Sequence, residues 1–204
     1  LSTGLPQEVL MHADTLNRIR DIAYEAINAG ATPGCRVLVA RKGKIVYDRS
    51  FGWLTYENQI PVTEETLYDL ASITKVSATL QATAFLYEKG LIDLNKKMSV
   101  YLPELKGTNK EDMIIKDILT HQAGLWPFLP FWADTMKDSL HLPAYYAPNR
   151  TNDFPFNVSH NLFAVSAMKD SLWHWIVRSK VREKPPRTPY DYRYSDMGFY
   201  MLQH

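Results

Sequence analysis

The four-residue pattern S-x-x-K occurs twice in the sequence, as Ser72-Ile73-Thr74-Lys75 and as Ser166-Ala167-Met168-Lys169. A serine hydroxyl is a weak nucleophile until a neighbouring base activates it. A lysine three residues further along a helix lies one turn away, so its amine can reach that hydroxyl. Either serine could therefore be the nucleophile of a covalent acyl-transfer reaction. Only the surrounding sequence can indicate which of the two it is.

The sequence around the two copies favours Ser72 as the nucleophile. Polar sequence precedes Ser72 and a helical pattern begins at it, so its hydroxyl lies in a first turn that Asp69 could cap. The positive end of the helix dipole there favours a developing alkoxide. We expect Ser166 to lie inside a helix over residues 160–180, where its side chain bonds back to the preceding turn.

The helix after Ser72 has almost no polar face, which predicts that it is buried on most sides. Its residues include Ala78, Thr79, Leu80, Ala82, Thr83, Ala84, Phe85 and Leu86. Burial of an ammonium is costly, so it would lower the pKa of Lys75 and make the amine a proton acceptor. The alternative is that Lys75 is a buried cation held by a carboxylate.

An acyl-transfer cycle also needs a group that protonates the leaving atom. Tyr194 could do this from the string Tyr194-Ser195-Asp196, which follows a connector with prolines at 185, 186 and 189 and begins another predicted helix. The alternative is a core tyrosine with a satisfied hydroxyl. A literal Y-x-N string, Tyr56-Glu57-Asn58, lies in the polar segment after the predicted hairpin, and we interpret it as a turn.

The elements that must position these side chains follow from the hydrophobic periodicity. An amphipathic helix is predicted over residues 14–29 and a β hairpin over 35–51. A short helix is predicted at 113–120, and the last helix is expected to start near Asp196. The segment 125–160 fits neither period, and we interpret it as either a lid or binding loop or an aromatic cap on the core.

Composition limits the class of protein. The 204 residues include 23 basic and 22 acidic side chains, for a net charge of +1, which argues against a nucleic-acid binder. No apolar run approaches the roughly 18 residues that span a bilayer. The single cysteine, Cys35, cannot form an internal disulfide, and we interpret it as a small buried residue. The six histidines lack paired-ligand spacing, so no metal and no cofactor are expected; His121 is expected to make a structural hydrogen bond.

The chain resembles the serine β-lactamase and penicillin-binding-protein superfamily in three motifs that occur in order. They are S-x-x-K after a hairpin, "ILTHQAGL" at 118–125 and "YSDMGFYML" at 194–202. The likeness is nearest to class C β-lactamases, D-Ala-D-Ala carboxypeptidases and related esterases. The chain resembles still more closely the β-lactamase-like domains fused to family 3 glycoside hydrolases in Bacteroidetes-type bacteria. This likeness lies in the strings "GATPGCRVLVARKGK", "LYDLASITK", "GTNKED" and "RYSDMGFY".

The resemblance implies an α+β fold, with an antiparallel sheet flanked by helices beside an all-helical subdomain. It implies that Ser72 is the acylated nucleophile, that Lys75 activates it and that Tyr194 is the general acid and base. Asp196 would close the second motif, next to Lys75 and the substrate amide. The implied reaction is hydrolysis of an ester or amide in a small molecule or a peptidoglycan-type substrate, in the periplasm or cell envelope.

One departure from the family pattern lies in the second motif. Asp196 stands where class C enzymes have asparagine, and a carboxylate can only accept hydrogen bonds. Its negative charge also favours the ammonium form of Lys75. We therefore expect an esterase or peptidase-like hydrolase and not efficient β-lactam turnover.

A second departure is that the third motif, K-T-G or H-x-G, does not occur after Tyr194. We therefore expect residues 1–204 to be the N-terminal portion of one β-lactamase-like domain, with a linker at 1–13, a helix and hairpin at 14–52 and a mainly helical part at 53–204. The sheet would have only the two strands of residues 35–51, and it would expose an edge to the missing C-terminal part or to a second copy of the chain.

Two other classes of protein compete with the serine hydrolase. The chain could be a noncatalytic module that keeps the fold to bind cell-wall or glycan fragments, or an accessory domain of a larger glycoside hydrolase. Labelling of Ser72 by a penicillin or a fluorophosphonate would separate these alternatives, because a binding module should not be acylated. A metal hydrolase is disfavoured by the absence of an H-E-x-x-H string.

Overall fold

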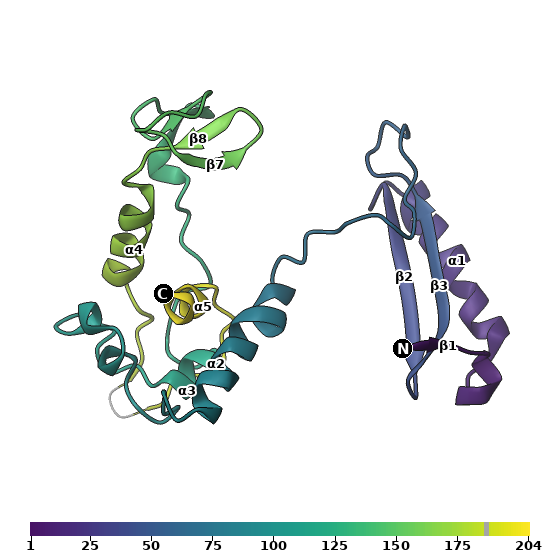
Figure 1. The fold of residues 1–204 in the computed structure, drawn as a ribbon, viewed down its shortest axis with the longest axis horizontal. Coiled ribbons are helices and arrows are strands. Elements are labelled where there is room, and N and C mark those ends of the chain that lie inside the picture. The colour runs from purple at the N-terminus through teal and green to yellow at the C-terminus, as the bar shows by residue number, and fades with distance from the viewer. Residues whose placement is uncertain (186–187) are drawn as a thin grey trace. The chain divides into compact units, whose positions relative to one another are not determined.

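The computed structural model describes residues 1–185 and 188–204 (Figure 1). The described chain forms two compact units, Leu1–Asp69 and Leu70–His204. The prediction that both units belong to one domain stays a prediction. Part of the proline connector expected at 185–189 lies outside the described residues.

The first unit is a small sheet with one long helix. Strands β2 (Gly34–Arg41) and β3 (Lys44–Gly52) form the predicted antiparallel hairpin. Helix α1 (Ala13–Asn28) packs on this hairpin and buries Leu16 and Ala23. Its predicted amphipathic pattern is confirmed, since only one face is buried.

The sheet has a third strand, so the expectation of a two-stranded sheet is wrong. Strand β1 (Ser2–Thr3) pairs in parallel with Lys44 and Ile45 of β3, and the strand order is β1-β3-β2. A 3₁₀ turn, η1 (Pro6–Val9), follows it, so the segment expected to be a linker has secondary structure. Two residues are enough to pair the backbone groups of an edge strand, but they are too few to produce a sequence period.

The second unit holds the helices around one hydrophobic core. The elements are η2 (Lys75–Thr79), α2 (Leu80–Glu88), η3 (Met98–Val100), η4 (Pro103–Leu105), α3 (Ile115–Leu119), α4 (Met168–Arg178) and α5 (Met197–Gln203). The core draws on η3, η4, α3, α4, α5 and the loops between them, and includes Leu105, Ile115, Ile118, Ile176, Met197 and Met201. None of the helices in the described residues is long and apolar enough to cross a membrane.

Short strands interrupt the segment that was expected to be irregular. A 3₁₀ turn, η5 (Ala133–Thr135), leads into β4 (Met136–Lys137), which pairs with β5 (Leu140–His141). Strands β6 (Tyr146–Ala147), β7 (Phe156–Ser159) and β8 (Leu162–Ala164) form a second, antiparallel sheet in the order β6-β8-β7. The prediction of an irregular loop over 125–160 is therefore wrong in part.

The helix expected over 160–180 begins only at Met168, because β8 occupies the start of that range. Ser166 is exposed in the turn before α4, and its N–H donates to the carbonyl of Asp153 at 2.7 Å. The reason given for setting Ser166 aside, that it lies inside a helix, is therefore wrong. The comparison between the two serines has to be made from their contacts.

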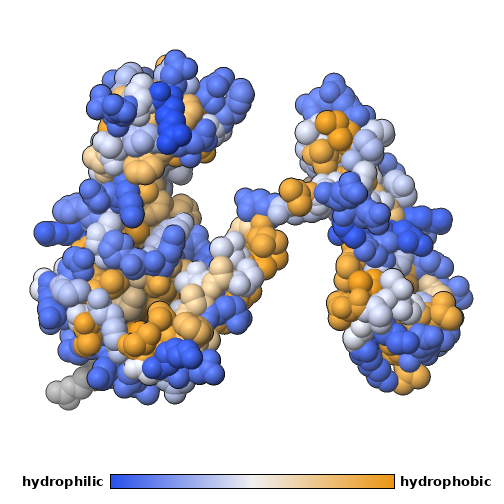
Figure 2. Space-filling model, viewed as in Figure 1, coloured by the Kyte–Doolittle hydropathy of each residue, from blue (hydrophilic) through white to orange (hydrophobic). Residues whose placement is uncertain are grey.

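Helix α2 is exposed within the second unit, so this unit does not by itself bury it on most sides as expected. Among its residues only Thr83 is buried, whereas Val76 in η2 and Phe85 in α2 are 53% and 56% exposed. Figure 2 shows apolar atoms at the surface of this unit. An apolar composition indicates that a helix needs a partner, but no described part of this unit covers this face.

Candidate active site

Ser72 and Lys75 lie together at the start of the helix. Lys75 Nζ is 3.0 Å from Ser72 Oγ. Ser72 follows Ala71, whose φ of 43° is in the left-handed region that alanine rarely adopts. Lys75 opens η2, a π-helical turn, and such turns are frequent at functional sites. The sequence predicted the helix start but neither of these backbone features.

Tyr194 reaches the same serine from the other end of the chain. Its phenol oxygen is 2.7 Å from Ser72 Oγ, across a sequence separation of 122 residues. The ring also lies 5.2 Å from Lys75 Nζ. By contrast, the side chain of Ser166 makes no hydrogen bond within residues 1–185 and 188–204. These contacts, and not helix position, distinguish Ser72 from Ser166.

Asp196 forms an ion pair with the lysine. Its carboxylate is 2.5 Å from Lys75 Nζ, and the Lys75 side chain is 15% exposed. Asp196 occupies the N-cap of α5, yet its side chain caps no helix N–H. Ser195 takes that role instead, since its Oγ accepts from the Met197 N–H at 3.2 Å. The Asp196 carboxylate is thereby left for Lys75.

The ion pair determines the charge of the lysine. Burial acts to lower the pKa of Lys75, but the hydrogen bonds and charges of Asp196 and Tyr194 outweigh it, so the pKa lies above its ordinary value. The expectation of a pKa lowered overall is therefore wrong, although burial acts in the expected direction. The alternative, a buried cation held by a carboxylate, describes the resting state.

His121 also belongs to the site, although the sequence predicted only a structural hydrogen bond for it. It makes the expected hydrogen bond, with Nδ1 accepting from the Ser195 N–H at 3.1 Å. Its ring also packs on Tyr194, with centroids 4.6 Å apart. The position of His121 in the string "ILTHQAGL" was the available signal, but its contact with the tyrosine segment depends on the tertiary fold.

A cavity of about 330 Å³ opens at these residues. Its lining includes Ser72, Lys75 and Asp196, and also Phe199 and Tyr200 of α5, which the sequence reasoning did not single out. Burial raises the pKa of Tyr200, and the charge of Asp196 adds to this effect. No group of three or more His, Cys, Asp or Glu side chains in the described part of the chain could hold a metal ion.

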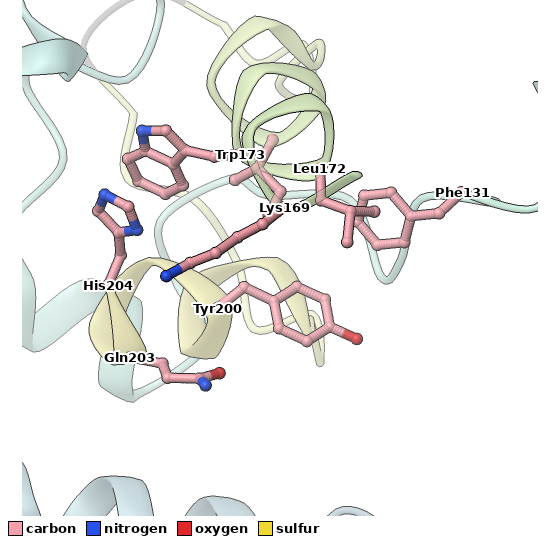
Figure 3. Close-up of a pocket in the computed structure, with 8 residues that line it drawn as sticks. Phe131, Lys169, Leu172, Trp173, Tyr200, Gln203 and His204 are labelled. Carbon is pink, nitrogen blue, oxygen red and sulfur yellow. The ribbon is translucent and has the colours of Figure 1, made fainter. Parts of the chain in front are cut away.

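A second cavity, of about 460 Å³, lies between α4 and α5 (Figure 3). Phe131, Leu172 and Trp173 give it apolar walls. Tyr200 and Gln203 line both cavities, so the two hollows are neighbours across α5. This second cavity contains none of the four residues predicted to carry the chemistry.

Comparison with known proteins places the chain in a family. Residues 19–204 match the family described as Beta-lactamase, and the chain belongs to it. A β-lactamase from Providencia stuartii is 32% identical over 133 residues, which cover 65% of this chain and 33% of that protein. A proposed D-alanyl-D-alanine carboxypeptidase from Salmonella typhimurium is 31% identical over 223 aligned residues, which cover 99% of this chain and 43% of that protein.

The fold is also that of a solved class C enzyme. The class C β-lactamase from Rhodobacter sphaeroides superposes with a TM-score of 0.56 at 24% identity, over 90% of this chain and 41% of that one. The expected α+β fold is thereby confirmed. The chain spans 33% to 43% of the length of the two curated relatives.

Proposed function

We propose that the chain is the serine-nucleophile part of a hydrolase that acts on an ester or an amide through a covalent acyl-enzyme. The observation that carries the proposal is the meeting of three side chains at one oxygen. Ser72 Oγ lies 3.0 Å from Lys75 Nζ and 2.7 Å from the Tyr194 oxygen. A nucleophile within hydrogen-bond reach of two proton-transfer groups is the arrangement that acyl transfer requires.

In the first half-reaction, Ser72 Oγ attacks the substrate carbonyl carbon and its proton passes to the Lys75–Tyr194 pair. The pair can accept it only when the amine is neutral or the phenol is ionised. The carbonyl oxygen becomes an anion, and the Ser72 N–H, which donates to no protein acceptor in the described residues, is available to it. Tyr194 then protonates the leaving group as its bond to the carbonyl carbon breaks, which leaves the acyl-enzyme.

In the second half-reaction, water repeats these steps in reverse. It gives a proton to Tyr194, attacks the acyl carbon and releases the acid, while the proton returns to Ser72 Oγ. The Lys75 ammonium, held by Asp196 at 2.5 Å, stabilises the negative charge that passes between the serine and tyrosine oxygens.

For the substrate, we propose a neutral or cationic ester or amide. Asp196 puts a carboxylate into the cavity wall, where it offsets the positive charge of Lys75 that would otherwise attract an anion, and it accepts hydrogen bonds but donates none. A β-lactam and a D-Ala-D-Ala peptide both carry a carboxylate of their own, so both should be poorer substrates than a neutral ester. Comparison of ester, D-Ala-D-Ala peptide and penicillin hydrolysis by one preparation tests this preference, and faster penicillin hydrolysis would contradict it.

The reaction class is tested by the initial burst with p-nitrophenyl acetate in excess over the protein. The unchanged protein should release one p-nitrophenolate per Ser72. Ser72→Ala should release none, and Ser166→Ala is the matched control that should behave as wild type. Dependence on Ser166 would assign the reaction to the other S-x-x-K copy. A folded protein that binds cell-wall fragments but forms no adduct would instead be the noncatalytic module.

We also propose that further polypeptide covers the apolar face of η2 and α2, either the rest of a β-lactamase-like domain or a second copy. The exposure of Val76 and Phe85 within the second unit supports this, because a folded protein rarely leaves such a face open. The relatives are also longer than this chain. We expect that polypeptide to supply the second oxyanion donor, so residues 1–204 should hydrolyse esters about a hundredfold to a thousandfold more slowly than a longer form.

The covering polypeptide is tested by comparing residues 1–204 with a form extended by about 100 to 150 residues, a typical domain increment. The extended form should be monomeric and the faster esterase. A monomeric short form with equal activity would contradict the proposal. From the resemblance alone we propose a periplasmic or cell-envelope location and fusion to a family 3 glycoside hydrolase, which cell fractionation and a longer gene sequence test.

A further inference from the structure

His121 contacts the chain on both sides of Tyr194. Its carbonyl oxygen accepts from the Arg193 N–H at 2.9 Å, and its Nδ1 accepts from the Ser195 N–H at 3.1 Å. Between these two bonds the imidazole packs against the Tyr194 ring itself, with centroids 4.6 Å apart. His121, which follows the end of α3, therefore contacts three consecutive residues, Arg193, Tyr194 and Ser195.

The backbone of His121 is shaped for this position. Its φ is 59°, in the left-handed region, where histidine, asparagine and aspartate are tolerated better than most residues. Its N–H donates to the Ile118 carbonyl at 3.1 Å, which ties the turn to α3. Ile118 is buried in the hydrophobic core, so the turn is anchored to a rigid part of the unit.

We propose that His121 is a positioning residue for acyl transfer: as a neutral imidazole with its proton on Nε2, it holds both neighbours of Tyr194 and so sets the phenol oxygen against Ser72. The kinetic part of this inference rests on the proposed function. The hydrogen-bonding part rests on geometry, because a ring nitrogen that accepts from an N–H cannot carry a proton of its own.

Protonation of His121 would break the arrangement. An imidazolium donates from both nitrogens, so Nδ1–H would face the Ser195 N–H and the bond would be lost. The charged and titratable groups that face the ring are Lys75 of η2, Asp196 at the start of α5, and Tyr192 and Tyr194 of the preceding segment.

The surroundings keep the ring neutral. Burial lowers the pKa of His121 and the charge of Lys75 lowers it further, against the opposing effects of Asp196 and the bond to Ser195. The net direction is downward from the ordinary value of 6.5. The arrangement should therefore hold at neutral pH and fail in acid, below the pH at which a free histidine titrates.

Three variants separate positioning from a merely structural role. His121→Asn keeps an acceptor near the place of Nδ1 and tolerates the left-handed backbone, but it does not titrate. His121→Leu has similar bulk and no acceptor. His174→Asn, on the exposed side of α4, is the matched control. The readout is the single-turnover rate of acylation by p-nitrophenyl acetate as a function of pH, with circular dichroism as the folding check.

We expect His121→Leu to slow acylation by about a hundredfold, as a misplaced catalytic group does. His121→Asn should restore most of the rate at neutral pH and should lose the part of the acidic limb that comes from His121. His174→Asn should leave both unchanged. A folded His121→Leu protein that acylates at the wild-type rate would overturn the inference, as would failure of His121→Asn to recover more rate than His121→Leu.

Nitrogen NMR of the histidine rings gives a test that needs no activity. His121 should show its proton on Nε2, and it should protonate below the ordinary pKa of 6.5. The Tyr194 ring signals should move in His121→Leu and stay in His174→Asn. A proton on Nδ1 would overturn the inference even if Ser72 is acylated. Absence of Ser72 acylation would instead overturn the proposed function. The NMR result would then still test whether His121 Nδ1 accepts the Ser195 N–H.

Discussion

Lys75 and Lys110 lie in the same unit and both keep their ammonium groups largely out of water, but their surroundings differ. Lys110 is fully buried, and its Nζ donates to Asn109 Oδ1 at 2.9 Å, to the Val177 carbonyl at 3.2 Å and to the Ser179 carbonyl. None of these acceptors carries a charge. Burial therefore lowers the pKa of Lys110 to about 8, whereas Asp196 holds the pKa of Lys75 above its ordinary value.

The two sites show that a lowered pKa does not by itself identify a catalytic lysine. Lys110 would be the better base in mild alkali, but its ammonium holds carbonyls at the C-terminal end of α4, where helix acceptors lack partners. Lys75 has the nucleophile at 3.0 Å but is kept as an ammonium. Contact with Ser72 and Tyr194 distinguishes the proposed catalytic role of Lys75 from the structural role of Lys110.

The largest effect that the comparison predicts is on acylation. Lys75→Met should slow acylation of Ser72 by p-nitrophenyl acetate by about a thousandfold, within the range of general acid–base groups. Lys110→Met, which removes a more deeply buried ammonium whose hydrogen bonds go to Asn109, Val177 and Ser179, should leave the rate close to wild type. Stopped-flow absorbance measures both. Equal losses in the two variants would mean that the effect of Lys75 is only on folding.

The next effect is a shift of the pH profile by Asp196→Asn. Removal of the anion lowers the pKa of Lys75, so a larger fraction of the amine is neutral at a given pH and the acidic limb of the acylation rate should move to lower pH. On that limb the rate at fixed pH should rise about tenfold for each pH unit of displacement. Asp191→Asn, which removes the carboxylate paired with Arg182, is the control.

An acidic limb that stays in place in Asp196→Asn would mean that the carboxylate does not act on Lys75. Movement of the limb in both variants would point to a general effect of net charge. The ionic strength should be held constant, because screening weakens the interaction between partly exposed charges.

The smallest effect concerns stability and has the opposite sign at the two lysines. Between pH 8 and 10.5 the unfolded chain binds more protons at Lys110 than the folded protein does, so the free energy of unfolding should rise with pH there. At about 1.4 kcal/mol per pH unit the rise is about 3 kcal/mol at most. The raised pKa of Lys75 acts in the other direction, since its contribution is lost as pH rises past its folded value.

Urea unfolding of wild type and Lys110→Met across that pH range isolates the Lys110 contribution. The difference between the two proteins should change with pH by a few kcal/mol, because the methionine cannot titrate. A constant difference would show that Lys110 titrates near its ordinary value and that its ammonium is hydrated in solution.

Local features were predictable from the sequence. The hairpin of β2 and β3 and the helix starts after Ser72 and Ser195 follow from neighbours in sequence or from a short motif. The charge effect of Asp196 on Lys75 was expected only because the family resemblance puts the two side by side. The contact of Tyr194 with Ser72 spans 122 residues. No spacing rule predicts such a contact, and only the family resemblance placed the two together.

The wrong predictions share a physical cause, which is that partners outside the local segment decide the outcome. Strand β8 is three residues long and shows no period, so a helix pattern was extended across it to Ser166. Burial of α2 was inferred from its apolar residues, but burial depends on what covers them. The pKa of Lys75 was first inferred from burial alone, and Asp196 reverses its direction.

The central claim is that Ser72 becomes acylated with the help of Lys75 and Tyr194. Peptide mass spectrometry after an acid quench of the reaction with p-nitrophenyl acetate tests it most directly. The proposed mechanism predicts one acetyl group on the peptide that contains Ser72, its loss in Ser72→Ala and its strong reduction in both Lys75→Met and Tyr194→Phe. An acetyl group on Ser166, or an undiminished adduct in Ser72→Ala, would contradict the claim.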